Sequence, residues 1–311
     1  MNGTTLELRR GPSAHAPELI LKGTTAAATA IILLMLAVIL IDIIIGGTKV
    51  LSWEFVSAAP TDGMTKGGIF PAIFGTVAMT LLMTVAAVPA GVATAVFLTE
   101  YAPARSKLAR VIRVCIANLA GVPSIVFGLF GLGFFISTIG SAIDRGLYDG
   151  RLVYGKPSLI WASLTLAILT LPVVVVATEE ALRAVPRELR DASLALGATK
   201  LQTVTRVVMP EALGGVLTGS ILAISRGAGE VAPIMFTGAA YFLPFLPSHL
   251  NDQFMNLSYH VYVLATQSPD VDRTKPLLYG TVLVLLLLTF LLNLIAVLIR
   301  AKTRARLRAE A

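Results

Sequence analysis

Arg226 and Glu230 stand four residues apart inside a long apolar stretch of the sequence. Two side chains at this spacing lie on one face of a helix. A charge near the middle of a membrane costs about 2.5–3.5 kcal/mol on insertion scales, so it persists only where it is paired or faces water. A guanidinium group offers a planar fork of donors that suits an oxyanion. The two residues therefore predict a structural ion pair, an anion site on a transport pathway, or a pair that opens and closes between these roles.

A second pattern lies in a loop that is rich in Arg and Lys. Its parts are the triplet Asp191-Ala192-Ser193, then Gly197 after three further residues, and Pro210 at the end of the loop. Apolar residues recur at helical steps on both sides of the glycine: Leu182, Val185, Leu189, Ala192 and Leu196 before it, then Leu201, Val204, Val207 and Val208. The loop predicts two short amphipathic helices joined by a turn at Gly197, with Pro210 separating the loop from the next apolar stretch. Such helices either lie on a membrane surface or dock another protein.

These residues must be positioned by long apolar segments. The chain of 311 residues is 56% hydrophobic and 14% charged, whereas soluble domains carry about 25% charged residues. Six apolar stretches are each long enough to cross about 30 Å of hydrocarbon as a helix. They cover about residues 24–46, 69–99, 111–140, 158–181, 212–237 and 277–299. The sequence therefore predicts an all-α, polytopic membrane protein with six transmembrane helices and not a β-barrel, which would show short alternating segments.

The third stretch is interrupted by Gly121-Val122-Pro123-Ser124. Proline in a membrane helix frees a carbonyl and bends the helix axis, which is tolerated where neighbouring helices cover the gap. The break is either a packing kink or a broken helix that lines a translocation path. On the second interpretation Pro123 and Ser124 are candidate pathway residues.

The distribution of positive charge predicts the orientation. Seventeen of the 25 Lys and Arg residues lie in the N-terminal tail, the 100–113 loop, the 183–206 loop and the C-terminal tail. By the positive-inside rule these segments, and so both termini, are cytoplasmic. The predicted organisation is a tail at 1–23, a six-span domain at 24–300 with a cytoplasmic loop at 183–211, and a basic tail at 301–311 that can contact anionic lipid. The basic charge therefore gives no reason to expect nucleic acid.

Acidic residues beside the basic loops are expected to pair with them. Glu100 is expected to cap the membrane interface beside Arg105, and Glu179 to pair with Arg183 or Arg187. The long external loop at 238–276 is expected to cap the outer mouth or to meet an external partner, because it is too long for a simple connector.

Several activities leave no trace in the sequence. It contains no Gly-x-x-x-x-Gly-Lys-Ser/Thr phosphate loop, so any ATPase must be a separate polypeptide. The single Cys115 and the scattered His15, His249 and His260 predict no metal site, no cofactor and no catalytic residues. A membrane enzyme would show clustered carboxylates, His or Cys, and an ion-driven secondary transporter would show inverted repeats.

The triplet, glycine and proline of the basic loop resemble the EAA loop of permease subunits of ATP-binding cassette (ABC) importers, with Asp191 for the usual Glu and Ser193 for the second Ala. Residues 121–129, 179–186 and 226–233 resemble the phosphate-specific ABC permeases. The resemblance implies a type I ABC importer permease fold. It implies ATPase coupling through Asp191, Ala192, Ser193, Gly197 and Pro210, and phosphate transport through Arg226 and Glu230. Arg183 is a further transport candidate, or a membrane anchor or ATPase contact.

The resemblance also implies partners and a location. They are a homologous second permease that forms a heterodimer, an ABC ATPase dimer, an extracytoplasmic phosphate-binding protein and phosphate, at the bacterial inner (plasma) membrane. Transport into the cytoplasm would proceed by alternating access. Sulfate, molybdate and phosphonate are alternative substrates, because the docking loop is common to permeases for all these anions.

Overall fold

The computed structural model describes residues 15–62, 66–103, 105–268 and 271–310. Six helical segments among them are long and apolar enough to cross a membrane: Leu19–Thr48, Phe70–Tyr101, Ser124–Leu147, Leu159–Ala184, Lys200–Gly229 and Val271–Thr303. The prediction of an all-α protein with six spans is therefore confirmed. The bounds of the third and fifth spans differ from those expected, for reasons given below.

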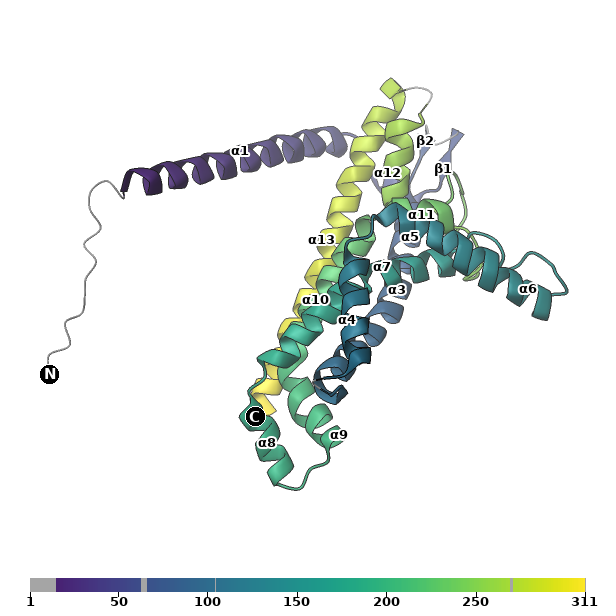
Figure 1. Cartoon of the computed structure of the whole chain (residues 1–311). Helices are drawn as coiled ribbons and strands as arrows, with labels where there is room; N and C mark the ends of the chain where they lie inside the picture. Colours follow the sequence, from purple (N-terminus) through teal and green to yellow (C-terminus); the bar gives the residue numbers. More distant parts are fainter. Residues whose placement is uncertain (1–14, 63–65, 104, 269–270, 311) are drawn as a thin grey trace.

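The centre of the bundle is built from three helices, α3 (Phe70–Val96), α7 (Leu159–Ala184) and α10 (Met209–Gly229). Both α3 and α10 pack along α7, and α13 (Val271–Glu310) lies beside α10 (Figure 1). The α3–α7 contact is filled by Met79, Met83 and Leu166, which are fully buried. This central layer fixes where each helix end, and thus each charged side chain, can lie.

Small residues bring α7 and α10 close together. Gly215 and Gly219 on α10 have Gly-x-x-x-Gly spacing, and a β-carbon on either would overlap the side chains of Ala181 and Ala177 on α7. Small residues at this spacing let two membrane helices approach closely, so that van der Waals contact holds them together. The glycine directly before Gly215, Gly214, faces open space within the described part of the chain.

The third predicted span is divided in two. Helix α4 (Lys107–Ala120) ends at the break, and α5 (Ser124–Phe130) continues through the π-helical η4 (Gly131–Gly140) into α6 (Ser141–Leu147). Pro123 precedes α5 in an extended conformation (φ −57°, ψ 139°), since proline lacks an N–H and disfavours helix in the residue before it. The expected bounds of 111–140 were wrong because an amphipathic basic helix was joined to the apolar one.

The fifth predicted span is displaced along the sequence. Helix α9 (Lys200–Thr203), the π-helical η5 (Val204–Val208) and α10 form one continuous rod, which ends at Gly229. Pro210 lies in the first turn of α10 and does not separate the loop from the span, contrary to expectation. The wider π turn before it accommodates a residue that cannot donate its backbone N–H. A break at Glu230 then leads into a separate short helix, α11 (Ala232–Thr237).

The end of the bundle opposite α8 (Arg187–Ala195) and α9 is closed by the long loop. It carries α12 (Leu257–Thr266), near which lie α2 (Trp53–Ser57) and the two-stranded sheet of β1 (Pro60–Thr61) and β2 (Lys66–Gly67) (Figure 1). Phe254 is fully buried, and the backbone N–H of Leu257 donates to Thr76 Oγ1 on α3 at 2.9 Å. The loop therefore packs into the bundle and is more than a connector.

Helix α1 (His15–Thr48) extends away from the other helices (Figure 1). It touches α13 at its C-terminal end, where the Tyr279 hydroxyl donates to Asp42 Oδ2 at 2.7 Å. Its first residue lies inside the segment expected as a tail at 1–23, whose residues 1–14 lie outside the described part. At the other end of the chain, α13 continues as helix through most of 301–311.

The close α7–α10 contact predicts a sharp difference between neighbouring glycines. Gly219→Val should lower the apparent unfolding temperature of the purified protein, because overpacking costs about 1–3 kcal/mol. Gly214→Val makes the same change on the open face of the same helix and should leave that temperature unchanged. Thermal unfolding followed by size-exclusion chromatography measures both. Equal effects of the two variants would contradict the close contact.

Candidate functional site

The predicted docking loop is a pair of short helices with a defined turn. Helix α8 is followed by Gly197 at φ 83°, the left-handed region that favours glycine. The Gly197 N–H donates to the Leu194 carbonyl at 3.0 Å, and the Ala198 N–H to the Ser193 carbonyl at 3.2 Å. These two bonds form a Schellman motif, which satisfies the carbonyls at the end of α8. The three residues between the triplet and the glycine are therefore the last two residues of α8 and its C-cap, Leu196.

The second helix of the pair is fixed by side chains. Thr199 and Gln202 form a reciprocal capping box at the start of α9. Ser193 Oγ lies 2.9 Å from Thr203 Oγ1, so it joins α8 to α9. Ser193 is half-buried in this contact. The Asp191 and Ala192 side chains are exposed.

Helix α8 buries none of its own residues. Leu189 and Leu194 are exposed, and Leu196, just after the helix, is 89% exposed. The predicted first helix began too early, since Leu182 belongs to α7, and Val185-Pro186 forms an extended break before α8. Apolar burial therefore does not hold α8 against the bundle.

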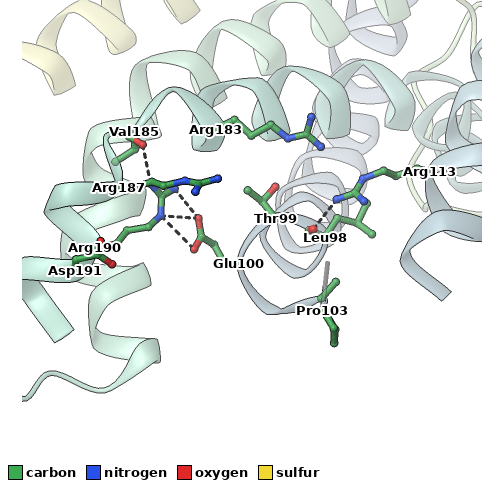
Figure 2. Close-up of a pocket in the computed structure, with 11 residues that line it drawn as sticks. Leu98, Thr99, Glu100, Pro103, Arg113, Arg183, Val185, Arg187, Arg190 and Asp191 are labelled. Carbon is green, nitrogen blue, oxygen red and sulfur yellow. Dashed lines mark hydrogen bonds and ion pairs between the residues drawn. The ribbon is translucent and has the colours of Figure 1, made fainter. Parts of the chain in front are cut away.

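A cavity of about 620 Å³ lies between α8 and the ends of two other helices (Figure 2). Its basic lining comes from α4, α7 and α8, and its opposite wall from the π-helical η3 (Phe97–Tyr101). The residues that line it are Leu98, Thr99, Glu100, Ala102, Pro103, Arg113, Arg183, Val185, Arg187, Arg190 and Asp191. Two members of the predicted site, Arg183 and Asp191, thus meet at one cavity.

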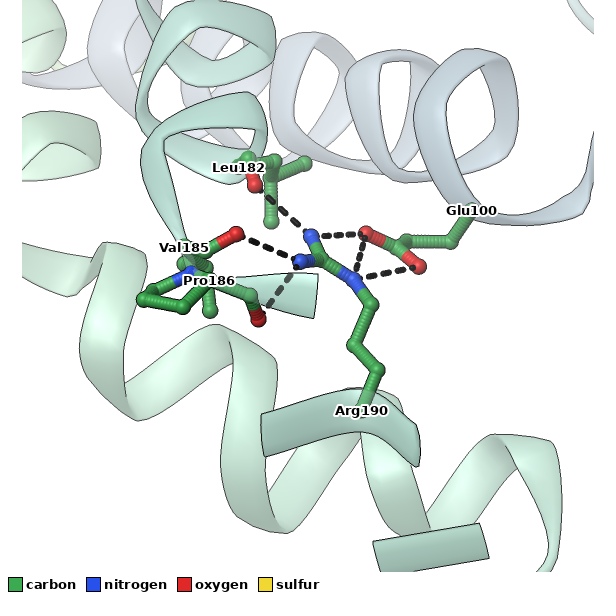
Figure 3. Close-up of polar contacts among 5 residues, drawn as sticks. All are labelled: Glu100, Leu182, Val185, Pro186 and Arg190. Atoms are coloured by element: carbon green, nitrogen blue, oxygen red, sulfur yellow. Dashed lines mark hydrogen bonds and ion pairs between the residues drawn. The ribbon is translucent and has the colours of Figure 1, made fainter. Parts of the chain in front are cut away.

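Arg190 makes several hydrogen bonds at this cavity (Figure 3). Its Nη2 donates to Glu100 Oε1 at 2.8 Å and to the Leu182 carbonyl at 2.7 Å. Its Nη1 donates to the carbonyls of Val185 at 2.7 Å and Pro186 at 3.3 Å. The Arg190 and Glu100 side chains are only 18% and 9% exposed. One guanidinium group therefore neutralises a buried carboxylate and satisfies the carbonyls at the end of α7.

Glu100, which was expected to cap the membrane interface beside Arg105, pairs with Arg190. Sequence reasoning missed Arg190 because it is one basic residue among several in the loop. The available signal was its place next to the triplet, but no sequence pattern indicates which carboxylate it meets 90 residues away.

Glu179 has the pairing that was expected and one more. Arg183 Nη2 lies 2.8 Å from Glu179 Oε2, and Arg113 Nε lies 3.3 Å from Oε1. Arg113 Nη2 also donates to the Leu98 carbonyl at 2.6 Å. Two arginines therefore share one carboxylate at the edge of the cavity.

Arg226 and Glu230 form the expected pair, with Arg226 Nε 3.5 Å from Glu230 Oε1. Their side chains are 44% and 18% exposed. Glu230 lies just beyond the end of α10 in an extended conformation, so the two residues do not share a helix face as expected. Gly227 packs against Met83, whereas Gly229 faces open space within the described residues. The pair is therefore long and partly open at a helix break.

The Arg226–Glu230 pair lies far from the end of the bundle that carries α8 and α9. Arg226 stands 16 residues beyond Pro210, or about 24 Å along the helix. Pro123 is exposed at the start of α5. Within the described part of the chain, no hydrogen bond or ion pair links Pro123 or Ser124 to the pair. Helix α5, which begins at Ser124, nevertheless packs against α11, which starts two residues after Glu230. Pro123 and Ser124 therefore belong to an element next to the pair, whereas Arg183 and the α8–α9 residues lie at the other end of α7 and α10.

Residues 102–308 match the protein family described as binding-protein-dependent transport system inner membrane component. The chain belongs to this family. The family shows that this is a multi-pass membrane protein, as its six apolar helices indicate.

Family members with curated names include phosphate permeases. The chain is 36% identical over 242 residues to the phosphate transport system permease protein PstA 1 of Mycobacterium tuberculosis (strain ATCC 25618 / H37Rv), covering 77% of this chain and 72% of that protein. It is 33% identical over 260 residues to PstA of Pasteurella multocida (strain Pm70), covering 83% and 85%. It is 37% identical over 195 residues to the probable ABC transporter permease protein YqgI of Bacillus subtilis (strain 168), of which it spans only 61%.

Solved structures confirm the expected type I ABC importer permease fold. A chain of a bacterial alginate ABC transporter, in complex with an alginate pentasaccharide-bound periplasmic protein, matches with a TM-score of 0.65 at 13% identity, over 90% of this chain and 93% of that chain. A chain of the inward-facing MetNI methionine ABC transporter matches with a TM-score of 0.57 at 19% identity, over 75% and 94%. At these identities the likeness concerns the fold alone.

The contacts of Arg190 predict a local loss of stability. Arg190→Ala would leave the Glu100 carboxylate and the α7 carbonyls without their partner, at a cost of about 3 kcal/mol. Amide hydrogens of α8 should then exchange roughly a hundredfold faster in hydrogen-exchange mass spectrometry. Arg206→Ala is the control, because Arg206 is exposed on η5, lies outside the cavity and has no side-chain hydrogen bond or ion pair to other described residues. Unchanged protection in Arg190→Ala would show that α8 is held in another way.

Proposed function

We propose that this chain is the transmembrane permease subunit of an ATP-driven ABC importer that moves inorganic phosphate into the cytoplasm. The observation that carries the proposal is the partly open Arg226–Glu230 pair in a chain whose relatives over 77–83% of its length are named phosphate permeases. The type I permease fold supports the importer class.

The geometry of the Arg226 pair suits reversible binding of an oxyanion. At 3.5 Å the ion pair is longer than a strong charge-assisted bond of about 2.7–2.9 Å. Arg226 lies in the last turn of α10, where a cation is also favoured by the helix dipole. An oxyanion that displaces Glu230 would gain a guanidinium already oriented by its helix. Alternating access would then change which side of the membrane this arginine faces.

The α8–α9 helix pair is proposed to dock a separate ABC ATPase dimer. Its leucines are exposed and its turn is fixed by Gly197, so it presents a preformed apolar surface. Asp191, Ala192 and Gly197 would contact the ATPase, Ser193 would hold the helix pair together, and Pro210 would lie in the helix that receives the motion. The other proposed partners are a homologous second permease, which completes a heterodimer, and an extracytoplasmic phosphate-binding protein.

The proposed location is the bacterial inner membrane with both termini in the cytoplasm. The C-terminus lies at the same end of the bundle as α8 and α9 (Figure 1), which supports the orientation drawn from the positive charges. The proposed domains are the tail at 1–23, the six-span domain at 24–300 with its loop at 183–211, and the basic tail at 301–311.

Another oxyanion, such as sulfate, molybdate or phosphonate, is the second candidate substrate. A guanidinium group binds any of them, so the Arg226 chemistry does not separate them. The names of the relatives favour phosphate. An ion-driven secondary transporter is less favoured, because it has no use for an exposed helix pair such as α8–α9.

Uptake of labelled phosphate tests the substrate and Arg226 together. Cells lacking the gene should recover energy-dependent uptake when it is restored, and excess sulfate should not compete. Arg226→Ala should lower uptake at least tenfold, because a charged hydrogen bond to the anion is worth about 1.5–3 kcal/mol. Co-purification of the ATPase with the variant is the control for assembly. Phosphate uptake that the restored gene does not change would overturn the substrate, and normal uptake by the variant would remove Arg226 from the path.

The turn at Gly197 tests the docking of the ATPase. Gly197→Leu should weaken association with the ATPase severalfold, because a leucine at φ 83° costs about 1–2 kcal/mol and would displace α9 relative to α8. Gly197→Asn is the matched control, since asparagine adopts this conformation readily and should retain association. Quantitative pull-down from membranes measures both variants. Full association by Gly197→Leu would contradict docking through this turn.

A further inference from the structure

The cavity beside α8 has no part in the transport path proposed above, yet its lining is basic. Four arginines and two carboxylates, Glu100 and Asp191, face its volume of about 620 Å³. Arg190 and Glu100 neutralise each other at 2.8 Å. The remaining charges that face the cavity are those of Arg113, Arg183 and Arg187 and, with opposite sign, that of Asp191.

These three arginines are only partly compensated. Arg113 and Arg183 share the single carboxylate of Glu179, so their two charges face one opposite charge. Arg187 makes no hydrogen bond or ion pair with other described residues, although it lines the cavity. A guanidinium group has five N–H donors. The cavity therefore holds donors and positive charge that the chain itself does not use.

A hydroxyl group at the same cavity also lacks a partner. Thr99 Oγ1 is buried and forms no hydrogen bond with the described residues. Buried polar atoms are nearly always hydrogen-bonded, so this hydroxyl would gain a partner if a small rotation brought it to an anion in the cavity. In Figure 2 the guanidinium groups of Arg113, Arg183 and Arg187 lie around Thr99.

The start of α8 adds to the same preference. The helix begins at Arg187 after Pro186, and no side chain caps its first N–H groups. Uncapped N–H groups and the helix dipole favour a negative charge at this end. Val185 and Arg187, on either side of the helix start, both line the cavity.

We propose that this cavity is a second anion site, which binds a phosphate group through Arg113, Arg183, Arg187 and Thr99. A phosphate group carries the charge that the arginines lack and offers several acceptor oxygens to their unused donors. It comes either from inorganic phosphate in the cytoplasm or from the headgroup of an anionic lipid. The site does not depend on which substrate the transporter carries.

The site is separate from the Arg226 pair. Gly227 on α10 lies near Thr170 on α7, and Arg183 stands 13 residues further along α7, or about 20 Å along the axis. An anion in the cavity would contact η3, α4, α7 and α8 together. It would therefore stiffen the joint between the docking helix and the bundle.

Binding of labelled inorganic phosphate to the complete transporter tests the proposal. The complex is placed in nanodiscs of phosphatidylcholine and carries Arg226→Ala, so that anion at the other site does not contribute. Arg187→Gln should weaken phosphate binding about tenfold or more, and Thr99→Val severalfold. Arg110→Gln on α4 is the matched control, because it removes an exposed, unpaired arginine outside the cavity and should change nothing.

A second arm separates the two sources. Nanodiscs that also contain phosphatidic acid are analysed by native mass spectrometry for lipid that stays bound to the complex. Phosphate binding that depends on Arg187 supports a free anion, and retained phosphatidic acid that depends on Arg187 supports a lipid headgroup. Absence of both, or binding that Arg187→Gln and Thr99→Val leave unchanged, overturns the site. Because no arm measures transport, these outcomes hold whether or not phosphate is the transported substrate.

Discussion

The structure at the end of the bundle that carries α8 and α9 depends on the guanidinium group of Arg190. Where α7 ends, its last carbonyls lack helical partners, and Glu100 brings a carboxylate to the same place. Leaving either unsatisfied at this burial would cost several kcal/mol. Arg190 satisfies both from the first turns of α8, a helix that buries no residue of its own. One side chain thus links α8 to the end of α7 and to the segment that follows α3.

Breaks in the helices recur where the proposed functions lie. The chain leaves helical geometry at Pro123, at Val185-Pro186 and at Glu230, and π turns occur at η3, η4 and η5. In a membrane such breaks are tolerated only where protein or water covers the freed backbone groups. At Val185-Pro186 the cover is Arg190, and the break creates the basic cavity. At Glu230 the break places a carboxylate beside Arg226 without a shared helix.

The number of spans was predictable because apolar length alone decides it. The turn at Gly197 was predictable too, since few residues other than glycine accept a positive φ. The bounds of the third and fifth spans were not, because hydrophobicity does not show that the chain leaves the helix before Pro123 but stays helical through Pro210. The Glu100–Arg190 pair could not be predicted, as charge counts place both residues near the membrane surface but do not pair residues 90 positions apart. The Arg226–Glu230 pair could be predicted, because a charge in an apolar stretch is costly unless it is paired or faces water.

The most apolar stretch of helix α1 is not buried against the rest of the described chain. Helix α1 contacts α13 near the C-terminal end of α1. Its stability in a membrane therefore comes from lipid and from its own hydrogen bonds, with little help from later parts of the chain. It also precedes the other five described spans in the chain. Insertion of α1 can thus be complete while the rest of the chain is still on the ribosome, and the orientation it adopts is set before the helices that form the central layer exist.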